Sequence, residues 1–431
     1  MWAGQSLSEI GSTLSGVGVA VYVFLETGSA AWLGVLAAFA SVPYLVTAPV
    51  LSLTDRFSRR STMIAADTFA VVGPAVALVM AIAGQLQIWH LAVAGFLGGV
   101  GNAVQGPAAQ AAVPALVAPE ALGRANGLGQ LGQATGIVLG PVLATPLVAR
   151  WGIEAVLIVD IVTFMIAVLA TASVRFDDLP PDSSVADDKS WSALFAWLRT
   201  DGRPLTAVLG LMAGVNFLLA FFNVSLLVVA TDIGGTARAG VVLGAAGAAM
   251  IVGSIISGHR GVADDRVGTF ARGLMLAGGG FVVASLRTSL VLVIIGVVIA
   301  LGSMPAVKAA TSTLFHERVP SSMHGRMFGL RTALARSLEP LGSVAAGFVI
   351  ARLATPAVDD GGALAGNVGT VIGVGPGRGA ALVLGLVGMV LVAIGVWLGR
   401  SGTRAALRHV PSPQELDTVE ELAGDVISAP R

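Results

Sequence analysis

The sequence contains no cysteine and few charged residues. Its 431 residues include 25 Lys and Arg and 25 Asp and Glu, so charged side chains make up only 12% of the chain. An average soluble domain carries about 25% charged residues, and this composition therefore excludes an ordinary soluble globular protein. The absence of cysteine excludes disulfide bonds, thiolate metal sites and a cysteine nucleophile.

A phosphate-binding loop is also absent from the sequence. No glycine-rich stretch ends in Gly-Lys-Ser or Gly-Lys-Thr, and the glycine-rich segment Val374–Gly379 lacks the lysine that such a loop needs. We therefore expect no ATP-driven pumping by this chain. We also expect no enzymatic activity, no cofactor and no bound metal.

The sequence is instead rich in long apolar runs. Residues 27–54 and 68–119 contain no Asp, Glu, Lys or Arg, and the mean hydropathy of the whole chain is +0.85. A bilayer core about 30 Å thick requires roughly 20 apolar residues per helix, which such runs supply. They lack the alternating polarity of membrane β-strands, so helices are the remaining form that can span a membrane.

The apolar runs predict an all-α membrane protein with twelve transmembrane helices. A polar break at 174–203 divides the chain into two pseudo-symmetric six-helix halves, 1–173 and 204–400, and a polar tail occupies 401–431. The expected spans are 2–25, 30–52, 62–84, 88–112, 125–149, 153–173, 204–230, 239–258, 269–287, 289–315, 326–352 and 380–400.

Basic residues are distributed unevenly between the two sets of loops. If both termini and the loops after even-numbered spans are cytoplasmic, seventeen Lys and Arg lie on the cytoplasmic side. The other side holds five, namely Arg150, Arg238, Arg287, Arg352 and Arg378. Cytoplasmic loops carry the excess of Lys and Arg. We therefore expect a multi-pass plasma-membrane protein with the termini, the central loop and the tail in the cytoplasm.

The polar break ends in an amphipathic segment. Trp191 and Phe195 are four residues apart, as are Leu194 and Leu198. Residues four apart lie on the same face of a helix. The spacing predicts a short interfacial helix that leads into the seventh span.

A short internal repeat supports the division into halves. "PEALGRANGL" begins at Pro119 and "PSSMHGRMFGL" begins at Pro320, and both contain Gly-Arg, two residues and Gly-Leu. Their first glycines, Gly123 and Gly325, are 202 positions apart, and each follows the fourth span of its half. Repeated halves around a central site are typical of alternating-access transporters.

The loop after the second expected span contains the dense charged motif "DRFSRR". Its charged members are Asp55, Arg56, Arg59 and Arg60. The loop resembles the one between helices 2 and 3 of the major facilitator superfamily, with Leu51 and Ser58 at the family's two glycine positions. The resemblance implies a cytoplasmic gate motif, in which Asp55 reaches the N-terminal end of helix 11. A negative charge is favourable there because backbone N–H groups are exposed.

The fifth span carries a pattern of small residues. Its members are Gly127, Gly132, Gly136, Gly140 and Pro141. Glycines four residues apart form one helix face that a neighbouring backbone can approach closely, and the proline bends the helix. The pattern resembles the helix-5 motif of drug/proton antiporters, with Ala144-Thr145 at its terminal glycine pair. The stretch "GPAAQAAVPALV" (Gly106–Val117), followed by "GRANGL", further resembles the branch of macrolide efflux pumps and the enterobactin exporter. For the fifth span, the family resemblance implies a moving interface. The spacing alone is equally compatible with static packing.

Ionisable residues inside the expected spans are candidate coupling sites. Each costs about 2.5–3.5 kcal/mol on insertion scales and usually faces a cavity or a partner. Arg336 and Glu339 are three residues apart and can pair with each other, whereas Asp160 has no local partner and can load and release a proton. The candidates for proton coupling are Asp160, Glu339, Glu9 and Asp67. Arg336 also lies near mid-depth, and Lys308 and Arg331 lie closer to the cytoplasmic ends of their spans.

Uncharged polar and aromatic residues in the spans suggest a substrate cavity. Its predicted members are Asn102, Gln105, Gln133, Asn216, Phe217, Asn223 and Arg336. A few polar groups on an apolar wall suit a lipophilic substrate. The same residues are also compatible with hydrogen bonds between helices and with phenylalanines that face lipid.

The sequence therefore predicts a monomeric secondary transporter that exports small lipophilic compounds by proton antiport with alternating access. Its expected partners are the small-molecule substrate, protons and the lipid bilayer, with no nucleic acid. Three alternatives remain: an exporter of a siderophore or another secreted metabolite, a solute symporter, and a membrane scaffold that transports nothing.

Overall fold

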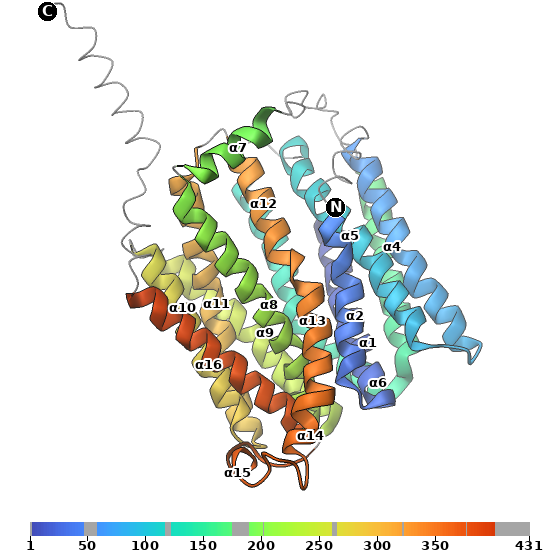
Figure 1. Ribbon diagram of the computed structural model, residues 1–431. Helices are drawn as coiled ribbons and strands as arrows, with labels where there is room; N and C mark the ends of the chain where they lie inside the picture. The colour runs from blue at the N-terminus through green and yellow to red at the C-terminus, as the bar shows by residue number, and fades with distance from the viewer. Residues whose placement is uncertain are drawn as a thin grey trace, which may run out of the picture.

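The computed structural model describes residues 2–46, 58–116, 122–174, 189–200, 202–260, 265–320, 323–375 and 377–400. Within these ranges every regular element is a helix, which confirms the predicted all-α fold. Figure 1 shows the helices as one bundle, with α7 at the top and α15 at the bottom. These two sides of the bundle are called the α7 end and the α15 end.

The N-terminal half begins with two helices joined by a tight turn at Gly28, whose φ of 62° lies in the left-handed region that favours glycine. Ser58 caps a later helix, because its hydroxyl accepts a hydrogen bond from the Ser61 backbone nitrogen at 3.2 Å. The elements of this half are α1 (Trp2–Thr27), α2 (Ala30–Ser41), the short 3₁₀ helix η1 (Val42–Val46), α4 (Arg59–Ile82), α5 (Ile88–Leu116) and α6 (Leu122–Ala172).

The C-terminal half follows the short helix α7 (Lys189–Arg199). Its eleventh expected span is broken at Leu338, directly before Glu339 and Pro340. Proline has no backbone N–H and favours the first turn of a new helix. The elements of this half are α8 (Arg203–Asp232), α9 (Gly235–Arg260), α10 (Arg266–Ser285), α11 (Leu290–Arg318), α12 (His324–Ser337), α13 (Glu339–Phe348), the π-helical η5 (Val349–Ala354), α14 (Thr355–Val358), α15 (Val368–Ile372) and α16 (Arg378–Arg400).

The long helix α6 consists of two arms that meet at Gly152. The backbone of Gly152 is not helical, with φ 74° and ψ −172°. In the first arm Gly136 lies against Glu9 and Gly140 against Thr13, so this arm runs parallel to α1. The second arm runs antiparallel to α1, as the facing residue pairs in the next paragraph show. The chain therefore reverses direction at Gly152, and the arms correspond to the expected spans 125–149 and 153–173.

A regular seam of small residues joins α1 to the second arm of α6. Glycines at every seventh position of α1 face residues at every seventh position of α6, in opposite order along the chain. The facing pairs are Gly4 with Ala170, Gly11 with Thr163, and Gly18 with Val156. Small residues let two helices approach closely in a bilayer, where association depends on van der Waals packing. This seam therefore fixes α6 against α1.

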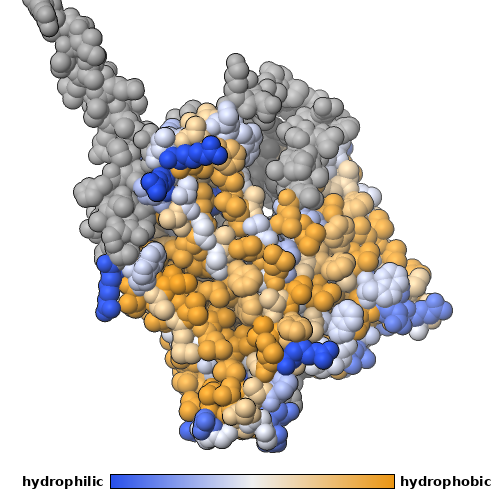
Figure 2. All heavy atoms as spheres, in the orientation of Figure 1, coloured by the Kyte–Doolittle hydropathy of each residue, from blue (hydrophilic) through white to orange (hydrophobic). Residues whose placement is uncertain are grey.

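The expected spans agree well with the described helices. Nine described helices are long and apolar enough, by length and composition, to cross a membrane. The span 30–52 corresponds to the shorter apolar segment Ala30–Leu45, and the span 88–112 lies within α5. One of the nine, Val138–Ala172, contains the second arm of α6 and the last part of the first. Figure 2 shows hydrophobic residues over the middle of the face in view and hydrophilic residues mainly toward its edges. This surface suits a lipid environment.

The short helix predicted at the end of the polar break is present as α7. Leu194 and Leu198 are buried in a hydrophobic cluster of the C-terminal half that includes Phe315. Trp191 and Phe195 point away from that cluster, with 40% and 45% of their surfaces exposed, and their ring centroids lie 6.2 Å apart. The face of α7 with Leu194 and Leu198 is therefore buried, and the face with Trp191 and Phe195 is exposed.

The two halves meet through small residues toward the α15 end. Gly34 of α2 lies against the Ser343 carbonyl of α13, and a Cβ on Gly347 would lie 2.6 Å from the Ala30 carbonyl oxygen. A second junction pairs α6 with α9, where a Cβ on Gly240 would lie 3.1 Å from Thr145 Oγ1. Figure 1 shows α2 beside α13, in agreement with these contacts.

Candidate functional site

A polar network ties together four helices of the N-terminal half. Gln5 of α1 donates hydrogen bonds to Asp67 Oδ2 of α4 at 3.0 Å and to Thr171 Oγ1 of α6 at 3.1 Å. Gln105 of α5 donates to Gln5 Oε1. Asp67 is only 3% exposed, so its carboxylate depends on these partners rather than on water. Two predicted site residues, Asp67 and Gln105, are thereby brought together.

Asp160 lies on the second arm of α6 and faces α1. The side chain is 4% exposed, and the Ser15 hydroxyl of α1 forms a hydrogen bond with its carboxylate. Its other oxygen, Oδ1, is buried and has no hydrogen-bond partner among the described residues. A buried carboxylate oxygen without a partner is costly, and a bound proton removes the charge that causes the cost. This geometry allows Asp160 to hold a proton.

A charged cluster lies where the two halves face each other. Arg336 Nη1 of α12 lies 3.7 Å from Glu339 Oε2 of α13, as the spacing of these residues predicts. The Arg336 guanidinium carbon also lies 4.2 Å from the ring centroid of Tyr44, which belongs to η1 of the N-terminal half. Glu9 of α1 interacts electrostatically with the same tyrosine. Glu9, Tyr44, Arg336 and Glu339 thus form a polar group made by both halves.

Two more basic residues lie on helices of the C-terminal half. Lys308 is an exposed residue of α11. The Arg331 guanidinium carbon lies 5.5 Å from the Phe315 ring centroid and 5.7 Å from that of Phe328. Arg331 of α12 therefore packs against aromatic rings of its own half.

The remaining predicted cavity residues are more dispersed. Asn216 donates a hydrogen bond to the Met212 carbonyl of its own helix at 2.8 Å, Phe217 stacks on Phe221 with centroids 5.4 Å apart, and Asn223 is exposed. Asn102 is half-buried on α5. These residues lie on two helices, α5 and α8, and no recorded contact joins the two sets within the described part of the chain.

The fifth-span motif lies against two different helices. Gly136 and Gly140 contact α1, and one turn later Thr145 and Val142 contact glycines of α9 in the other half. The Pro141 carbonyl accepts a hydrogen bond from Thr145 Oγ1 at 2.8 Å. Gly127 and Gly132 belong to the same arm of α6. The motif therefore leads directly into a junction between the halves.

Part of the predicted gate motif lies outside the described residues. This applies to Asp55 and Arg56, and the structure does not describe the side chains of Arg59 and Gln133. Arg60 is described, and its Nη2 donates a hydrogen bond to the Ala172 carbonyl at the end of α6. The helix that the gate motif is expected to reach begins at His324, next to Gly325-Arg326.

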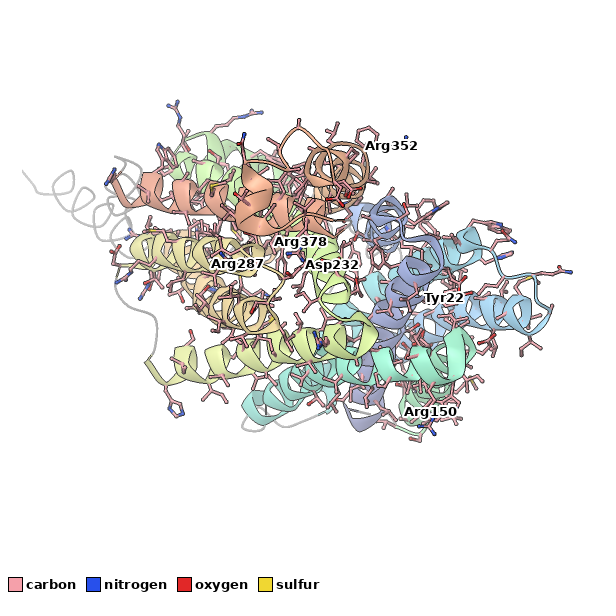
Figure 3. The ribbon with its side chains drawn as sticks, turned by 90° about the horizontal axis from the view of Figure 1, so that it is seen from below. Tyr22, Arg150, Asp232, Arg287, Arg352 and Arg378 are labelled. Carbon is pink, nitrogen blue, oxygen red and sulfur yellow. The ribbon has the colours of Figure 1, made fainter. Side chains whose placement is uncertain are left out.

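The sequence analysis missed a buried ion pair at the α15 end. Arg378 is 1% exposed, and its Nη2 and Nε lie 2.6 Å and 3.2 Å from Asp232 Oδ2. Its Nη1 donates to the Ile372 carbonyl at 3.2 Å. Figure 3 looks at this end and shows Arg378 and Asp232 next to each other. The signal available in the sequence was that Asp232 and Arg378 carry opposite charges and lie at span ends on the same predicted side of the membrane.

Two apolar grooves lie apart from all of these residues. One, of 840 Å³, lies between α10 and α16 and is lined by residues such as Val282, Met389 and Trp397. The other, of 350 Å³, lies between α4 and α5 beside Phe69 and Val104. No group of His, Asp and Glu suited to a metal ion occurs within the described ranges.

Residues 1–342 match the family model described as the Major Facilitator Superfamily. The chain belongs to this superfamily. Its all-helical fold is thus that of a major facilitator transporter, and the predicted family is confirmed.

Relatives and solved structures agree with this assignment. The major facilitator chain is 24% identical over 354 residues to a Streptococcus pyogenes protein named macrolide efflux protein A, covering 80% of this chain and 87% of the relative. It is 23% identical to the Enterococcus faecalis protein of that name, covering 70% and 95%. A bacterial homologue of the human lysosomal transporter Spinster is similar in fold, with TM-score 0.67, 15% identity, and coverage of 94% and 96%.

Proposed function

We propose that this chain is a secondary active transporter that exports small lipophilic compounds from the cytoplasm by proton antiport with alternating access. The observation that carries the proposal is the unequal contact between the halves. Small residues bring α2 against α13 and α6 against α9 toward the α15 end, whereas the charged group that faces across the halves includes exposed side chains such as Arg336 and Glu9. Alternating access requires such a junction to close on one side and open on the other.

The direction of export is supported by the charges and by the relatives. Arg150, Arg287, Arg352 and Arg378, which the loop pattern assigns to the outer side, all lie at the α15 end (Figure 3). Because cytoplasmic loops carry the excess of Lys and Arg, the α7 end is the proposed cytoplasmic side. The relatives named macrolide efflux protein A favour export of compounds of that kind over import.

The experiment is a retention assay with a labelled macrolide. We expect cells that express the protein to retain less of the compound than cells with an empty vector, and we expect a protonophore to abolish the difference. Equal retention in both strains would contradict export of macrolides. Higher retention in the expressing strain would indicate import and would favour a symporter.

A further inference from the structure

The larger of the two apolar grooves lies between α10 and α16, which run next to each other (Figure 1). The two helices touch through small residues. A Cβ on Gly278 would overlap the Gly388 carbonyl oxygen, and one on Gly395 would lie 2.7 Å from the Ala271 carbonyl oxygen. Beside this contact, no atom lies within 4 Å of a Cβ built on Gly279. The close backbones therefore form the floor of the groove, and its volume of 840 Å³ is within the range of ligand pockets.

The groove has an apolar body and a charged end. Its walls include Val282, Met389 and Val396, and Arg400 is the one charged side chain among the described residues that line it. Trp397 lines the groove one turn before Arg400 and is 56% exposed. Tryptophan is enriched at the interface between membrane and water. The end with Trp397 and Arg400 therefore suits the level of the lipid headgroups, and the rest of the groove suits the hydrocarbon region.

A second arginine lies at the same end, on α10. Arg272 is exposed and precedes Gly279 by seven residues, so both lie on one stripe of the helix. Because Gly395 lies against Ala271, Arg272 is at the same end of the helix pair as Arg400. Neither arginine forms an ion pair with a carboxylate in the described part of the chain. This end of the groove therefore attracts an anion.

The length of the groove is close to that of one bilayer leaflet. From Met389 to Arg400 it follows about 16 Å of α16, at a rise of about 1.5 Å per residue. Half of a hydrocarbon core about 30 Å thick is about 15 Å. A partner helix that packs along α16 would cover both leaflets, whereas a phospholipid occupies only one. The dimensions therefore favour a lipid over a second protein helix.

We propose that this groove binds an anionic phospholipid, with an acyl chain along Val282 and Met389 and the phosphate at Arg272 and Arg400. Basic pockets between transmembrane helices recognise lipid headgroups in this way. An arginine fork binds phosphate oxygens with two parallel hydrogen bonds. A zwitterionic phospholipid carries a cation beside its phosphate and binds less tightly to the same arginines. The inference is independent of the compound that the protein transports.

The test uses the absence of cysteine from the chain, because a single introduced cysteine then carries a single bimane fluorophore. Met389→Cys places the label in the groove. Met165→Cys on α6 is the matched control, since its side chain is 47% exposed, Met389 is 53% exposed, and Met165 does not line the groove. The full chain is reconstituted in phosphatidylcholine bilayers that contain brominated phosphatidylglycerol or brominated phosphatidylcholine, and quenching of the label is measured.

We expect brominated phosphatidylglycerol to quench the label at Met389→Cys at a mole fraction at least fivefold lower than brominated phosphatidylcholine does, as one basic residue near the headgroup implies. At Met165→Cys the two lipids are expected to quench equally. Equal quenching by the two lipids at both positions would overturn the proposal, because the groove would then hold only exchanging bulk lipid.

Two further variants of the Met389→Cys protein test the site itself. Arg400→Gln is expected to lower the preference for phosphatidylglycerol about fivefold, while Arg199→Gln, on an exposed arginine of α7, leaves it unchanged. Gly279→Leu fills the groove and is expected to remove the preference. Its control is Gly258→Leu, since a Cβ on Gly258 likewise meets no atom within 4 Å. A preference that survives both Arg400→Gln and Gly279→Leu would contradict the proposal.

A second copy of the chain is the alternative occupant. If it covers the groove, both brominated lipids quench the label at Met389→Cys more weakly than at Met165→Cys, and unlabelled Met389→Cys protein forms a disulfide-linked dimer under oxidation. That pair of results would overturn the proposal. We expect no such dimer and no such loss of quenching.

Discussion

Asp160 is a carboxylate in the interior of the bundle with only part of its hydrogen-bonding capacity used. Ser15 bonds the carboxylate, while Oδ1 has no partner in the described part of the chain. Asp67, by contrast, is held by Gln5 in a network that spans four helices. The structure therefore gives these two candidate carboxylates different surroundings. Of the two, Asp160 has the arrangement better suited to a proton that comes and goes.

The variant Asp160→Asn tests proton coupling, because the amide has nearly the shape of the carboxyl group but cannot take up and release a proton. In vesicles that contain the purified protein, we expect drug-driven proton flux to fall to background. The control is Glu317→Gln, which affects a carboxylate paired with Arg266 at 2.8 Å. Coupled flux that is unchanged in Asp160→Asn would eliminate this residue and return attention to Glu339, Glu9 and Asp67.

The ion pair between Arg378 and Asp232 has unequal partners. Arg378 is 1% exposed, while Asp232 is 24% exposed and can be hydrated when left alone. We predict that Asp232→Asn lowers the thermal unfolding midpoint more than Arg378→Met, because the first leaves a buried guanidinium without a counterion. Removal of one partner of a buried pair costs about 3–5 kcal/mol. The thermal unfolding midpoints of the two purified variants are compared. A lower midpoint for Arg378→Met than for Asp232→Asn would show that Asp232 depends more on its partner than Arg378 does.

At the scale of elements, the seam between α1 and α6 depends on the glycines of α1, which have no side chain at the positions of contact. A Cβ on Gly11 would overlap Thr163 Oγ1 and would lie 2.9 Å from Thr163 Cβ. That threonine cannot simply rotate away, because its hydroxyl donates to the Asp160 carbonyl at 2.9 Å and its χ1 is restricted. The seam therefore also positions the helix turn that carries Asp160.

We predict that Gly11→Ala destabilises the protein, by about 1–3 kcal/mol as for overpacked cores. Gly16→Ala on the same helix is the matched control, since no atom lies within 4 Å of a Cβ built there. The measurement is the yield of folded protein and its thermal unfolding midpoint in detergent. Equal stability of the two variants would show that the seam can relax to admit a methyl group.

At the scale of the whole molecule, the two halves touch through glycine-rich junctions toward the α15 end. The fifth-span motif lies in the arm of α6 that makes one of these junctions, with α9. A helix face without bulky side chains can slide or tilt against its partner without rearranging interlocked groups. The motif therefore lies beside a junction of this kind, as the proposed alternating access would need.

The predicted gate motif would act at the α7 end of the bundle, opposite the junctions toward the α15 end. We expect Asp55→Asn to insert normally and to lose efflux, because its carboxylate is expected to meet the exposed N–H groups at the start of α12 when the cytoplasmic side closes. The measurements are the protein level in the membrane and labelled macrolide retention. Asp187→Asn, in the central loop, is the control. Full efflux by Asp55→Asn would show that the motif serves only to orient the helices in the membrane.

The sequence by itself determined the membrane class and the approximate positions of the described helices. These properties follow from local composition, since a run of about 20 apolar residues has few alternatives to a membrane helix. The amphipathic spacing of Leu194 and Leu198 likewise predicted the buried face of α7. Loop arginines such as Arg150 and Arg352 were sorted correctly to one end of the bundle (Figure 3).

The tertiary structure alone decided which polar residues meet. Gln5 and Asp67 are 62 positions apart, and Asp232 and Arg378 are 146 apart. No local pattern connects such pairs, because their proximity depends on how whole helices pack. Arg336 and Tyr44 likewise belong to opposite halves, and only the packing of α12 against η1 brings the guanidinium carbon to 4.2 Å from the ring centroid. Helix positions follow from local hydrophobicity, whereas the chemistry of the interface depends on long-range packing.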